Sequence, residues 1–410
     1  MQRVLVTGMG VVSPTGCDLA SFFSSLVDAR SGVRRHPGDA AYLLDPLPVA
    51  AIDFNAAEHF SRMQAGQLDR HVQFALVAVR QAMNDAMPEI TPDERERAGV
   101  YWGTGMGGAD TLESAYTCLI GSDEKRLRPL TVVTAMANAA AAQISIEFSL
   151  LGPMLSISNA CSSSAMAIGE AMRAIRFGEI DVAIVGGSEA LLTSGTLRAW
   201  QVLGTLAELN PTHPEQSCCP FDRRRSGLVL GEGAAALVLE SETRARRRGA
   251  RIYAELSGYG NAADGQHLAR PDAAGQGRAM RAALRNAELR PEQIGYLNAH
   301  GTATKIGDAV ESEAIAQVFG SGVQDLAISS TKAVHGHLMG AAGAVEFIAC
   351  VLALTNRFAP PTAHLEEADA ACPLNYLPRQ GRELQAGHAV MSNSFAFGGG
   401  NAVLIARQYR

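Results

Sequence analysis

The sequence predicts a layered α/β protein in which helices cover both faces of buried sheets. Short runs of apolar and β-branched residues alternate with Ala-rich stretches along the whole chain, and this alternation is typical of the fold class. The runs are apolar at successive positions, as expected of strands that are buried on both faces. With 410 residues, of which 47% are hydrophobic and 19% charged, the chain can bury a large core and is not disordered.

The expected strands are short runs rich in Val, Ile and Leu. In chain order they span residues 4–7, 99–102, 155–158, 182–186, 235–239, 252–256, 327–330, 389–392 and 403–406. The Ala-rich stretches are expected to form helices at residues 70–86, 166–177, 276–287, 308–319 and 342–356. Two polar, turn-rich stretches, 34–47 and 208–219, are expected to be surface loops.

The two halves of the chain share a weak pattern. Each opens on a strand followed by spaced glycines, from Arg3 in the first half and from Arg251 in the second. Each later has a turn of small residues that leads into an Ala-rich helix, at 159–164 and at 335–343. We therefore expect two similar units, residues 1–250 and 251–410, although the sequence similarity between them is low.

Composition excludes several classes of protein. The net charge of −6 gives no overall basic field, so we expect no nucleic-acid partner. No run of about 18 consecutive apolar residues occurs, so we expect no membrane span. The seven cysteines are scattered without a C-x-x-C pair, which argues against a disulfide framework or a zinc site and favours the reducing cytoplasm. The glycine clusters at 8–10 and 103–108 do not fit a dinucleotide-binding fingerprint.

One cysteine lies where a strand is expected to end and an Ala-rich helix to begin. This is Cys161, among the small residues 158–169. At the N-terminus of a helix, unpaired N–H groups would lower the pKa of its thiol and make it nucleophilic. A single cysteine is also often a small buried hydrophobic residue, and this alternative stays open.

Histidines and charged groups gather in two later segments rich in Gly and Ala. His300 follows the apolar run 294–297, where a side chain can project into a cleft. Lys332, His335, His337 and Glu346 lie within fifteen residues of one another. A cysteine with distant histidines suggests nucleophilic thiol chemistry. A papain-like protease is the obvious alternative, but that family's signature around its cysteine is absent.

Together these segments resemble the β-ketoacyl-acyl-carrier-protein synthases of the condensing-enzyme (thiolase) superfamily, and most closely the elongating type II enzymes of the synthase I/II branch. The resemblance covers nearly the whole chain and includes Val6-Thr-Gly-Met-Gly, Trp102-Gly-Thr-Gly-Met-Gly-Gly, Asn159-Ala-Cys-Ser, Val185-Gly-Gly-Ser-Glu-Ala, Pro220-Phe-Asp, His300-Gly-Thr-Ala-Thr, the segment 332–343 and Asn393-Ser-Phe-Ala-Phe-Gly-Gly. It implies a thiolase-like, five-layered αβαβα fold built from two similar halves.

The resemblance also implies roles for individual residues. Cys161 would be the nucleophile, His300 and His337 the catalytic histidines, and Lys332 and Glu346 the charged groups of the site. The family's spacing from the lysine selects His337 rather than its neighbour at 335. The backbone N–H groups of Cys161 and Phe397 would form the oxyanion hole, with Phe397 as the gate of the acyl pocket. The implied substrate-binding residues are Thr302 and Thr304 for the pantetheine arm, with Met106 and Phe395.

The implied reaction is a decarboxylative Claisen condensation. An acyl chain held on Cys161 would be extended by two carbons from a malonyl group that an acyl carrier protein delivers on its phosphopantetheine arm. No metal or redox cofactor is implied. Three alternatives stay open, the first of which is a transacylase or cyclising ketosynthase that would use the same residues. A non-catalytic partner of the chain-length-factor type usually lacks the cysteine, and a degradative thiolase uses a second cysteine near its C-terminus, which the segment 392–401 does not contain.

Departures from the family pattern point away from housekeeping fatty acid synthesis and toward a specialised polyketide or polyene system. Ser162 to Ser164 follow the nucleophile, as is common in polyketide ketosynthases. Gly400 replaces a usual Thr, and Lys305 replaces a common Pro.

The resemblance implies two kinds of partner. The first is an acidic acyl carrier protein. The helix that usually docks it keeps only Arg62, so we expect docking to depend on a second basic patch, formed by Lys125, Arg126 and Arg128. The second is another subunit, either a second copy of this chain or a chain-length-factor-like protein, because Met106 matches a position that reaches into the pocket of the neighbouring subunit.

Overall fold

The structure, a computed structural model, describes residues 2–121 and 126–410. Ten strands form one mixed sheet in the order β11-β10-β14-β15-β9-β1-β8-β6-β4-β5. Five come from the first half of the chain: β1 (Val4–Val12), β4 (Ala98–Gly103), β5 (Met154–Ile157), β6 (Val182–Glu189) and β8 (Gly233–Ser241). Five come from the second half: β9 (Ala254–Ala263), β10 (Ile294–Asn298), β11 (Ala327–Ser329), β14 (Ala389–Phe395) and β15 (Gly400–Arg407).

The two sets of five strands have the same topology. The order β5-β4-β6-β8-β1 in one half-sheet corresponds strand by strand to β11-β10-β14-β15-β9 in the other. In each set the first three strands are parallel and the last two are antiparallel to their neighbours. The half-sheets join where Leu5 and Val6 pair with Glu255 and Ala254. Two similar halves are therefore confirmed, while the boundary at residue 250 stays a prediction.

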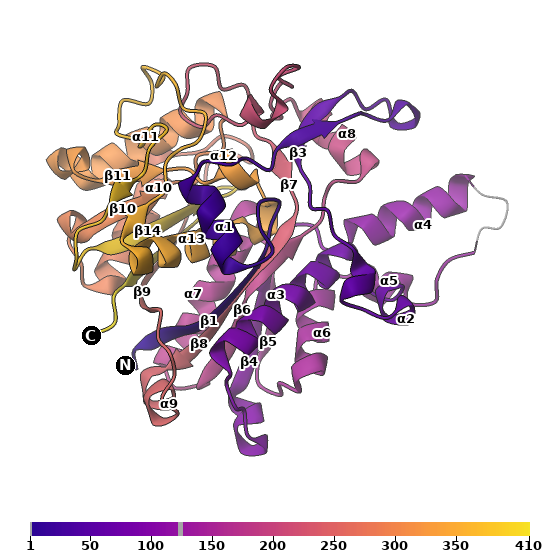
Figure 1. Cartoon of the computed structure of the whole chain (residues 1–410), viewed down its shortest axis with the longest axis horizontal. Helices are drawn as coiled ribbons and strands as arrows, with labels where there is room; N and C mark the ends of the chain where they lie inside the picture. The colour runs from indigo at the N-terminus through magenta and orange to yellow at the C-terminus, as the bar shows by residue number, and fades with distance from the viewer. Residues whose placement is uncertain (1, 122–125) are drawn as a thin grey trace.

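Helices cover the half-sheets on both faces and complete five layers (Figure 1). The helices α7 (Ser163–Arg176) and α13 (Ala342–Asn356) pack against each other between the half-sheets. On the outer face of the first half-sheet lie α3 (Arg70–Ala86) and α6 (Ala139–Phe148). The outer face of the second carries α10 (Ala273–Ala287) and α11 (Lys305–Phe319). The α/β fold class and its five layers are thus confirmed.

The remaining elements are short or lie at the edges of these layers. The helices are α1 (Leu19–Val27), α2 (Arg62–Ala65), α4 (Ala109–Gly121), α5 (Thr131–Ala135), α8 (Ser194–Leu203), α9 (Glu242–Arg247) and α12 (Lys332–His335). The strands are β2 (Arg34–His36), β3 (Leu47–Ala50), β7 (Leu230–Gly231), β12 (Phe358–Ala359) and β13 (Arg382–Glu383). The expected loop 34–47 is therefore partly wrong, because β2 lies within it and pairs with β3, which begins at its end, and β7 extends the small sheet.

One stretch in the described part of the chain is long and apolar enough to cross a membrane by length and composition alone. It is Met339–Asn356, and 83% of it is buried inside the molecule. Because α13 occupies the middle layer between the half-sheets, this apolar character is that of a core helix.

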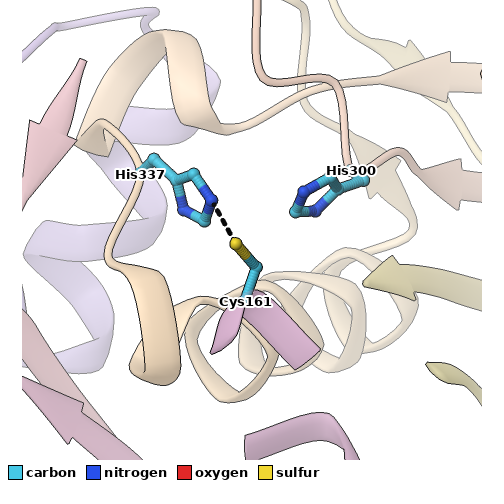
Figure 2. Close-up of side chains that lie close together, drawn as sticks. All are labelled: Cys161, His300 and His337. Carbon is cyan, nitrogen blue, oxygen red and sulfur yellow. Dashed lines mark hydrogen bonds between the residues drawn. The ribbon is translucent and has the colours of Figure 1, made fainter. Parts of the chain in front are cut away.

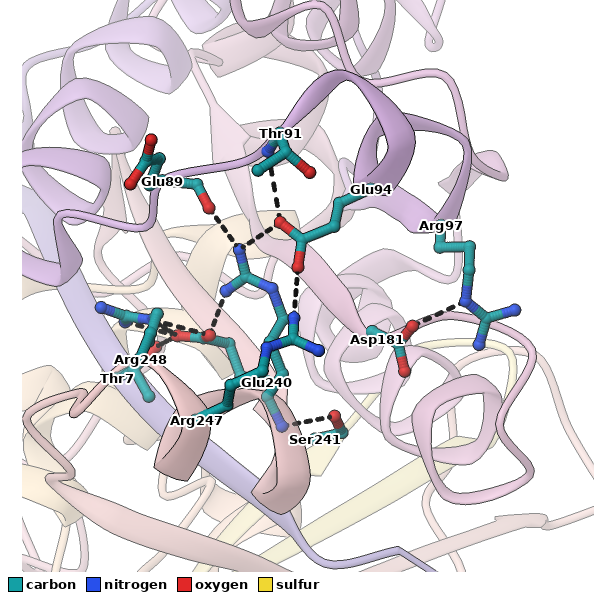
Figure 3. A network of polar contacts seen from close by, with 11 residues as sticks. Thr7, Glu89, Thr91, Glu94, Arg97, Asp181, Glu240, Ser241, Arg247 and Arg248 are labelled. Carbon is teal, nitrogen blue, oxygen red and sulfur yellow. Dashed lines mark hydrogen bonds and ion pairs between the residues drawn. The ribbon is translucent and has the colours of Figure 1, made fainter.

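A buried polar network ties the end of the first half to the start of the chain (Figure 3). Glu240 of β8 is buried and forms ion pairs with Arg244 and with Arg248, the latter at 2.6 Å. It also accepts the Thr7 hydroxyl at 2.5 Å, and Arg244 reaches Glu94 at 3.3 Å. Removing one partner of a buried pair typically costs about 3–5 kcal/mol, so this network fixes α9 against β1 and β8.

Candidate active site

The nucleophile predicted from the sequence lies in a tight turn at the start of a central helix. Cys161 is buried in the three-residue turn Ala160–Ser162, directly before α7. Ala160 has φ of 45°, a left-handed conformation that is uncommon for a residue with a side chain. Ser163 closes the turn, since its hydroxyl donates to the Ala160 carbonyl at 2.7 Å and accepts the Asn159 N–H at 2.8 Å. The turn directs the sulfur toward two histidines (Figure 2).

His337 contacts the sulfur directly. Its Nε2 lies 3.0 Å from Cys161 Sγ (Figure 2). Its other nitrogen, Nδ1, accepts the Met339 N–H at 3.2 Å. A nitrogen that accepts an N–H carries no proton, so the neutral ring carries its proton on Nε2 and donates toward the sulfur.

His300 lies edge-on to His337, with ring centroids 5.3 Å apart and planes 84° apart. Its Nδ1 lies 3.3 Å from the Nζ of Lys332, which also pairs with Glu346. An ammonium group can only donate, so Nδ1 of His300 accepts and Nε2 holds the proton. Glu311 accepts the backbone N–H of His300 at 2.8 Å, which fixes the backbone at this residue. Both histidines therefore present an Nε2–H to the same space.

Burial and one positive charge keep both rings neutral. Burial lowers the pKa of His300 and of His337 well below the ordinary value, and the Lys332 ammonium lowers both pKa values further. Burial raises the pKa of Glu346 to about 7, against the lowering effect of Lys332. Neutral imidazoles are suited to donating hydrogen bonds without transferring a charge into the cavity.

The expectation of a lowered thiol pKa at Cys161 is wrong. Burial raises the pKa of this thiol to about 12. The Lys332 charge and the backbone N–H groups of Phe397 and Cys161 lower the pKa, but by less than burial raises it. The cysteine lies in the turn directly before α7 and is shielded from water, so desolvation of the thiolate outweighs the effect of the helix N-terminus on the pKa.

Two backbone N–H groups are directed at the sulfur from opposite halves of the chain. They belong to Cys161 and to Phe397, which follows β14. Gly398 and Gly399 have φ of 85° and 73°, conformations that glycine adopts freely, and they shape the turn that carries the Phe397 N–H. The Phe397 ring lies beside Trp200, with centroids 6.0 Å apart. This geometry suits an oxyanion hole with an aromatic wall.

Asn159, a neighbour of the nucleophile, explains why position 400 is a glycine. A Cβ on Gly400 would lie 2.1 Å from Nδ2 of Asn159. Asn159 is itself held by its side chain, which donates to the Ser162 hydroxyl at 2.8 Å. The asparagine therefore occupies the space that a side chain at position 400 would need.

A cavity of about 350 Å³ collects most of the predicted site residues. It is lined, among others, by Cys161, His300, His337, Thr302, Thr304, Phe395 and Phe397. Lys332 and Glu346 lie buried behind the histidines. Met106 does not line the cavity and is exposed.

The neighbouring histidine at 335 takes no part in this cluster. His335 is buried and lies within hydrogen-bond distance of Thr331 Oγ1, at 3.0 Å, and of the Gly336 carbonyl, at 2.8 Å. Both ring nitrogens are therefore engaged by nearby parts of the same segment. The choice of His337 stays a prediction of role, but only His337 of the two contacts the sulfur.

A metal ion is geometrically conceivable at this cluster. Cys161, His300 and His337 place possible ligand atoms within 4.8 Å of one another, and a sulfur with two imidazoles is a donor set that zinc accepts. The buried ammonium of Lys332 lies 3.3 Å from Nδ1 of His300, however, and repels a cation from the same space. The residues around the cluster therefore do not favour a metal centre, although its donor atoms would fit one. The absence of a metal cofactor stays a prediction.

Comparison with known proteins decides the family. A model of the β-ketoacyl synthase N-terminal domain matches residues 1–245, and one of the C-terminal domain matches residues 253–366. The chain belongs to the β-ketoacyl synthase family. It is 38% identical over 407 residues to 3-oxoacyl-[acyl-carrier-protein] synthase 2 of Coxiella burnetii, covering 98% of both chains. It is 36% identical to the protein of the same name from Staphylococcus aureus, over 100% of this chain and 99% of the other.

Solved structures of the family share the fold along the whole chain. A β-ketoacyl synthase from Burkholderia phymatum superposes with a TM-score of 0.92 at 35% identity. The ishigamide ketosynthase/chain length factor gives 0.90 at 32%. A type II polyketide synthase ketosynthase, solved with its acyl carrier protein and bound to a hexaketide, gives 0.89 at 29%. In all three cases the match covers 100% of both chains.

The predicted docking arginines of this β-ketoacyl synthase lie on one surface. Arg62 begins α2, and Arg128 precedes α5. Nη1 of Arg128 donates to the carbonyl of Gly66, directly after α2, at 3.1 Å, so the two segments are adjacent. Arg126 is exposed in the same segment, and Lys125 lies outside the described residues.

Sequence reasoning missed several groups that shape this site. Glu311 holds the backbone at His300, Met339 sets the proton position on His337, and Trp200 lies beside Phe397. Glu311 and Trp200 lie outside the motifs of their partners. Met339 lies in the segment 332–343 together with His337, but it acts through its backbone N–H, which the residue type does not reveal. No sequence signal identified them.

A raised thiol pKa predicts how Cys161 reacts with pH. Its alkylation by iodoacetamide, followed by peptide mapping, should accelerate about tenfold per pH unit between about pH 7 and about pH 10, because the thiolate fraction rises with pH below the pKa. The variant Cys161→Ser should lose this labelled peptide and supplies the control. A rate that levels off below about pH 8 would show a thiolate at neutral pH and contradict the raised pKa.

Proposed function

We propose that the chain is a 3-oxoacyl-[acyl-carrier-protein] synthase. It condenses an acyl group held on Cys161 with a malonyl group on an acyl carrier protein, releasing CO₂ and a β-ketoacyl product. The observation that carries this proposal is the placing of Cys161 Sγ 3.0 Å from His337 Nε2, with His300 beside it in one cavity. The names of relatives at 36–38% identity support it.

In the first half-reaction the sulfur of Cys161 attacks the carbonyl carbon of an acyl thioester. The oxygen becomes negatively charged and accepts the N–H groups of Cys161 and Phe397. The bond to the pantetheine sulfur then breaks, and the proton of the Cys161 thiol ends on that sulfur. His337 keeps its own proton on Nε2, so it stabilises the sulfur by donation and does not remove the thiol proton.

In the second half-reaction the malonyl group loses its carboxylate as CO₂. The electron pair of the broken C–C bond forms an enolate, whose oxygen accepts Nε2–H from His300 and from His337. The enolate carbon attacks the carbonyl carbon of the acyl group on Cys161, a C–C bond forms, and the C–S bond breaks. The sulfur of Cys161 leaves as a thiolate and takes up a proton from water, which restores the thiol. The electrons come from the lost carboxylate, so we propose that neither a metal nor a redox cofactor takes part.

Thr302 and Thr304 are proposed to bind the pantetheine arm. Both line the cavity on the side of α11, and their hydroxyls lie 3.1 Å apart. Phe395 lies beside His300, with ring centroids 6.1 Å apart, so it is placed to contact substrate at the reacting end. An arm that enters along the threonines leads to Cys161, which lines the same cavity.

The presence of Cys161 with both histidines disfavours two of the three alternatives. A chain-length-factor-like partner would have no use for this cluster, and a degradative thiolase would need the second cysteine that the segment 392–401 lacks. The pathway is proposed to be specialised polyketide or polyene synthesis in the cytoplasm. The serines after Cys161, the Asn159–Gly400 contact and neighbours named as polyketide ketosynthase and ishigamide ketosynthase/chain length factor support this.

An apolar surface supports the proposal of a second subunit. Its residues lie on α4, α5, α6 and β5, each of which packs on the next. In the described chain β5 is an edge strand that pairs with β4 alone, and α4 projects away from the body (Figure 1). Its exposed apolar residues are Leu112, Tyr116, Ile120, Val132, Val133, Met136, Ile146, Met154 and Leu155, and Met106 is exposed in the turn before α4. Such a patch marks a protein interface, here with a second copy or a chain-length-factor-like subunit.

Separate variants should divide the two half-reactions. Cys161→Gln should abolish condensation but keep malonyl decarboxylation, because both histidines are intact. His337→Ala should lower the decarboxylation rate by about 10²–10³, the cost typical of losing one donor to an oxyanion. Product analysis of condensation and CO₂ release measures both. His213→Ala, an exposed histidine outside the cavity, is the control, and normal decarboxylation by His337→Ala would contradict the mechanism.

The apolar surface predicts the oligomeric state. Light scattering on the purified chain, alone and mixed with a candidate partner subunit, should show two-chain species. Leu155→Asp should shift these species toward single chains, because a carboxylate on the edge strand would be buried without a partner. Met87→Asp, which changes an exposed methionine at the end of α3, should not. A fully active single chain at micromolar concentration would contradict the proposal.

The basic surface predicts a dependence on salt. Reversing Arg126 and Arg128 to Glu should slow association with the carrier protein by about tenfold or more at low ionic strength and flatten the salt dependence. Condensation with small, carrier-free thioesters should barely change, because the cavity is untouched. Arg246→Glu, an exposed change on α9, is the control. Equal loss with both substrates would mean that the arginines support the fold, and no loss with either would place docking elsewhere.

A further inference from the structure

Glu189, the last residue of β6, is fully buried, and no step of the proposed reaction uses it. Its carboxylate accepts four hydrogen bonds. Oε2 accepts the N–H of Gly105 at 2.6 Å and of Gly340 at 2.9 Å. Oε1 accepts the N–H of Met106 and the hydroxyl of Thr104, at 3.3 and 3.2 Å. One carboxylate thus joins a turn of the first half to a turn of the second.

Two glycines make this approach possible. A Cβ on Gly340 would lie 2.6 Å from Oε2 of Glu189 and 2.3 Å from the nitrogen of Gly105. A Cβ on Gly105 would lie 2.7 Å from the same carboxylate oxygen. A side chain at position 340 would clash with the backbone of the other turn, and one at position 105 would displace the carboxylate, so the packing is arranged around the carboxylate.

On one side the carboxylate reaches the turn that orients His337. Gly340 follows Met339, whose φ of 47° is a left-handed conformation that a methionine rarely adopts. The Met339 N–H is the donor that occupies Nδ1 of His337 and leaves the proton on Nε2. Glu189 therefore anchors the residue next to the one that sets the proton position of His337.

On the other side the carboxylate reaches the apolar surface. Met106 is exposed in the turn that precedes α4, and its backbone is bound by Glu189. The Gly105 carbonyl accepts the hydroxyl of Ser158 at 3.0 Å, and Ser158 leads into the turn of Cys161. Burial raises the pKa of Glu189 to about 7, while its four donors lower the pKa and stabilise the charged form.

We propose that Glu189 is a positioning residue: it holds the strained turn at Met339 so that His337 keeps its proton on Nε2, and it ties that turn to the Met106 turn at the surface proposed to meet a second subunit. The role of the His337 proton in the reaction rests on the proposed function. The hydrogen bonds of Glu189 do not depend on that function.

The variant Glu189→Gln tests this. Its amide keeps the shape, but an NH₂ group cannot accept. In place of Oε2 it removes the acceptor of the Gly105 and Gly340 N–H groups, and in place of Oε1 it removes that of Met106, so the three N–H groups are no longer held together. We expect the kcat of malonyl decarboxylation to fall about 10- to 100-fold with KM little changed, because a small misplacement of a reacting group has costs of this size. In ¹⁵N-histidine NMR of the intact protein, the His337 signals, assigned by difference from His337→Ala, should shift from the Nε2–H form toward a mixture of tautomers.

Glu255→Gln is the matched control. Glu255 is also buried and accepts charged partners, Arg3 at 2.5 Å and Arg407 at 2.7 Å, but it lies on β9 and does not line the cavity. The variant Glu255→Gln should lower the free energy of unfolding in urea. It should change neither the His337 tautomer nor the kcat and KM of malonyl decarboxylation.

Two results would overturn the proposal. One is an unchanged His337 tautomer in Glu189→Gln. The other is a loss of activity in both variants that simply follows their loss of stability. A wild-type chain that fails to decarboxylate malonyl thioesters would instead sink the proposed function, and the NMR comparison would still decide the role of Glu189.

Discussion

The buried ammonium of Lys332 is the constraint on which the arrangement of the site depends. An isolated ammonium inside a protein costs several kcal/mol, and this explains why Glu346 interrupts an otherwise apolar central helix to pair with it. The same charge, with burial, keeps both histidines neutral. Because an ammonium only donates, it also determines that His300 turns its protonated nitrogen to the cavity. One lysine therefore sets charge, tautomer and orientation together.

The internal repeat explains why residues so far apart in the sequence meet. Cys161 and His337 are 176 residues apart, yet each lies in the turn just ahead of a central helix, α7 in one half and α13 in the other. Since these helices pack side by side between the half-sheets, their N-terminal turns are brought together (Figure 1). His300 follows β10, and the corresponding strand β4 leads to the turn of Met106. The first half thus supplies the cysteine, and the second half supplies both histidines.

Local patterns in the sequence were enough to predict the α/β fold class and the two halves, whereas the five layers and most of the residues that gather at the cavity were implied by the resemblance to a family. Helix 70–86 was predicted with its observed bounds, and the structure shows that Asp69 caps its start. The thiol pKa of Cys161 was predicted in the wrong direction, because the sequence shows a helix start but not the burial of the turn before it. The hydrogen bonds of Glu189 and Glu311 join residues 10 to 151 positions apart through backbone N–H groups, which leave no trace in residue type.

Thirteen non-glycine residues of the described chain have a left-handed φ, and three of them lie beside the reacting groups. Ala160 precedes Cys161, Ala303 lies between Thr302 and Thr304, and Met339 orients His337, and all three have left-handed φ between 45° and 65°. Each such residue costs on the order of 1–3 kcal/mol and persists only when its surroundings hold it. Here two of the three turns lead into helices packed between the half-sheets, so neither can relax without moving a central layer. The packed helices therefore hold the left-handed backbone of these two turns rigidly. This suits a reaction whose charged intermediates need hydrogen-bond donors that are already in place.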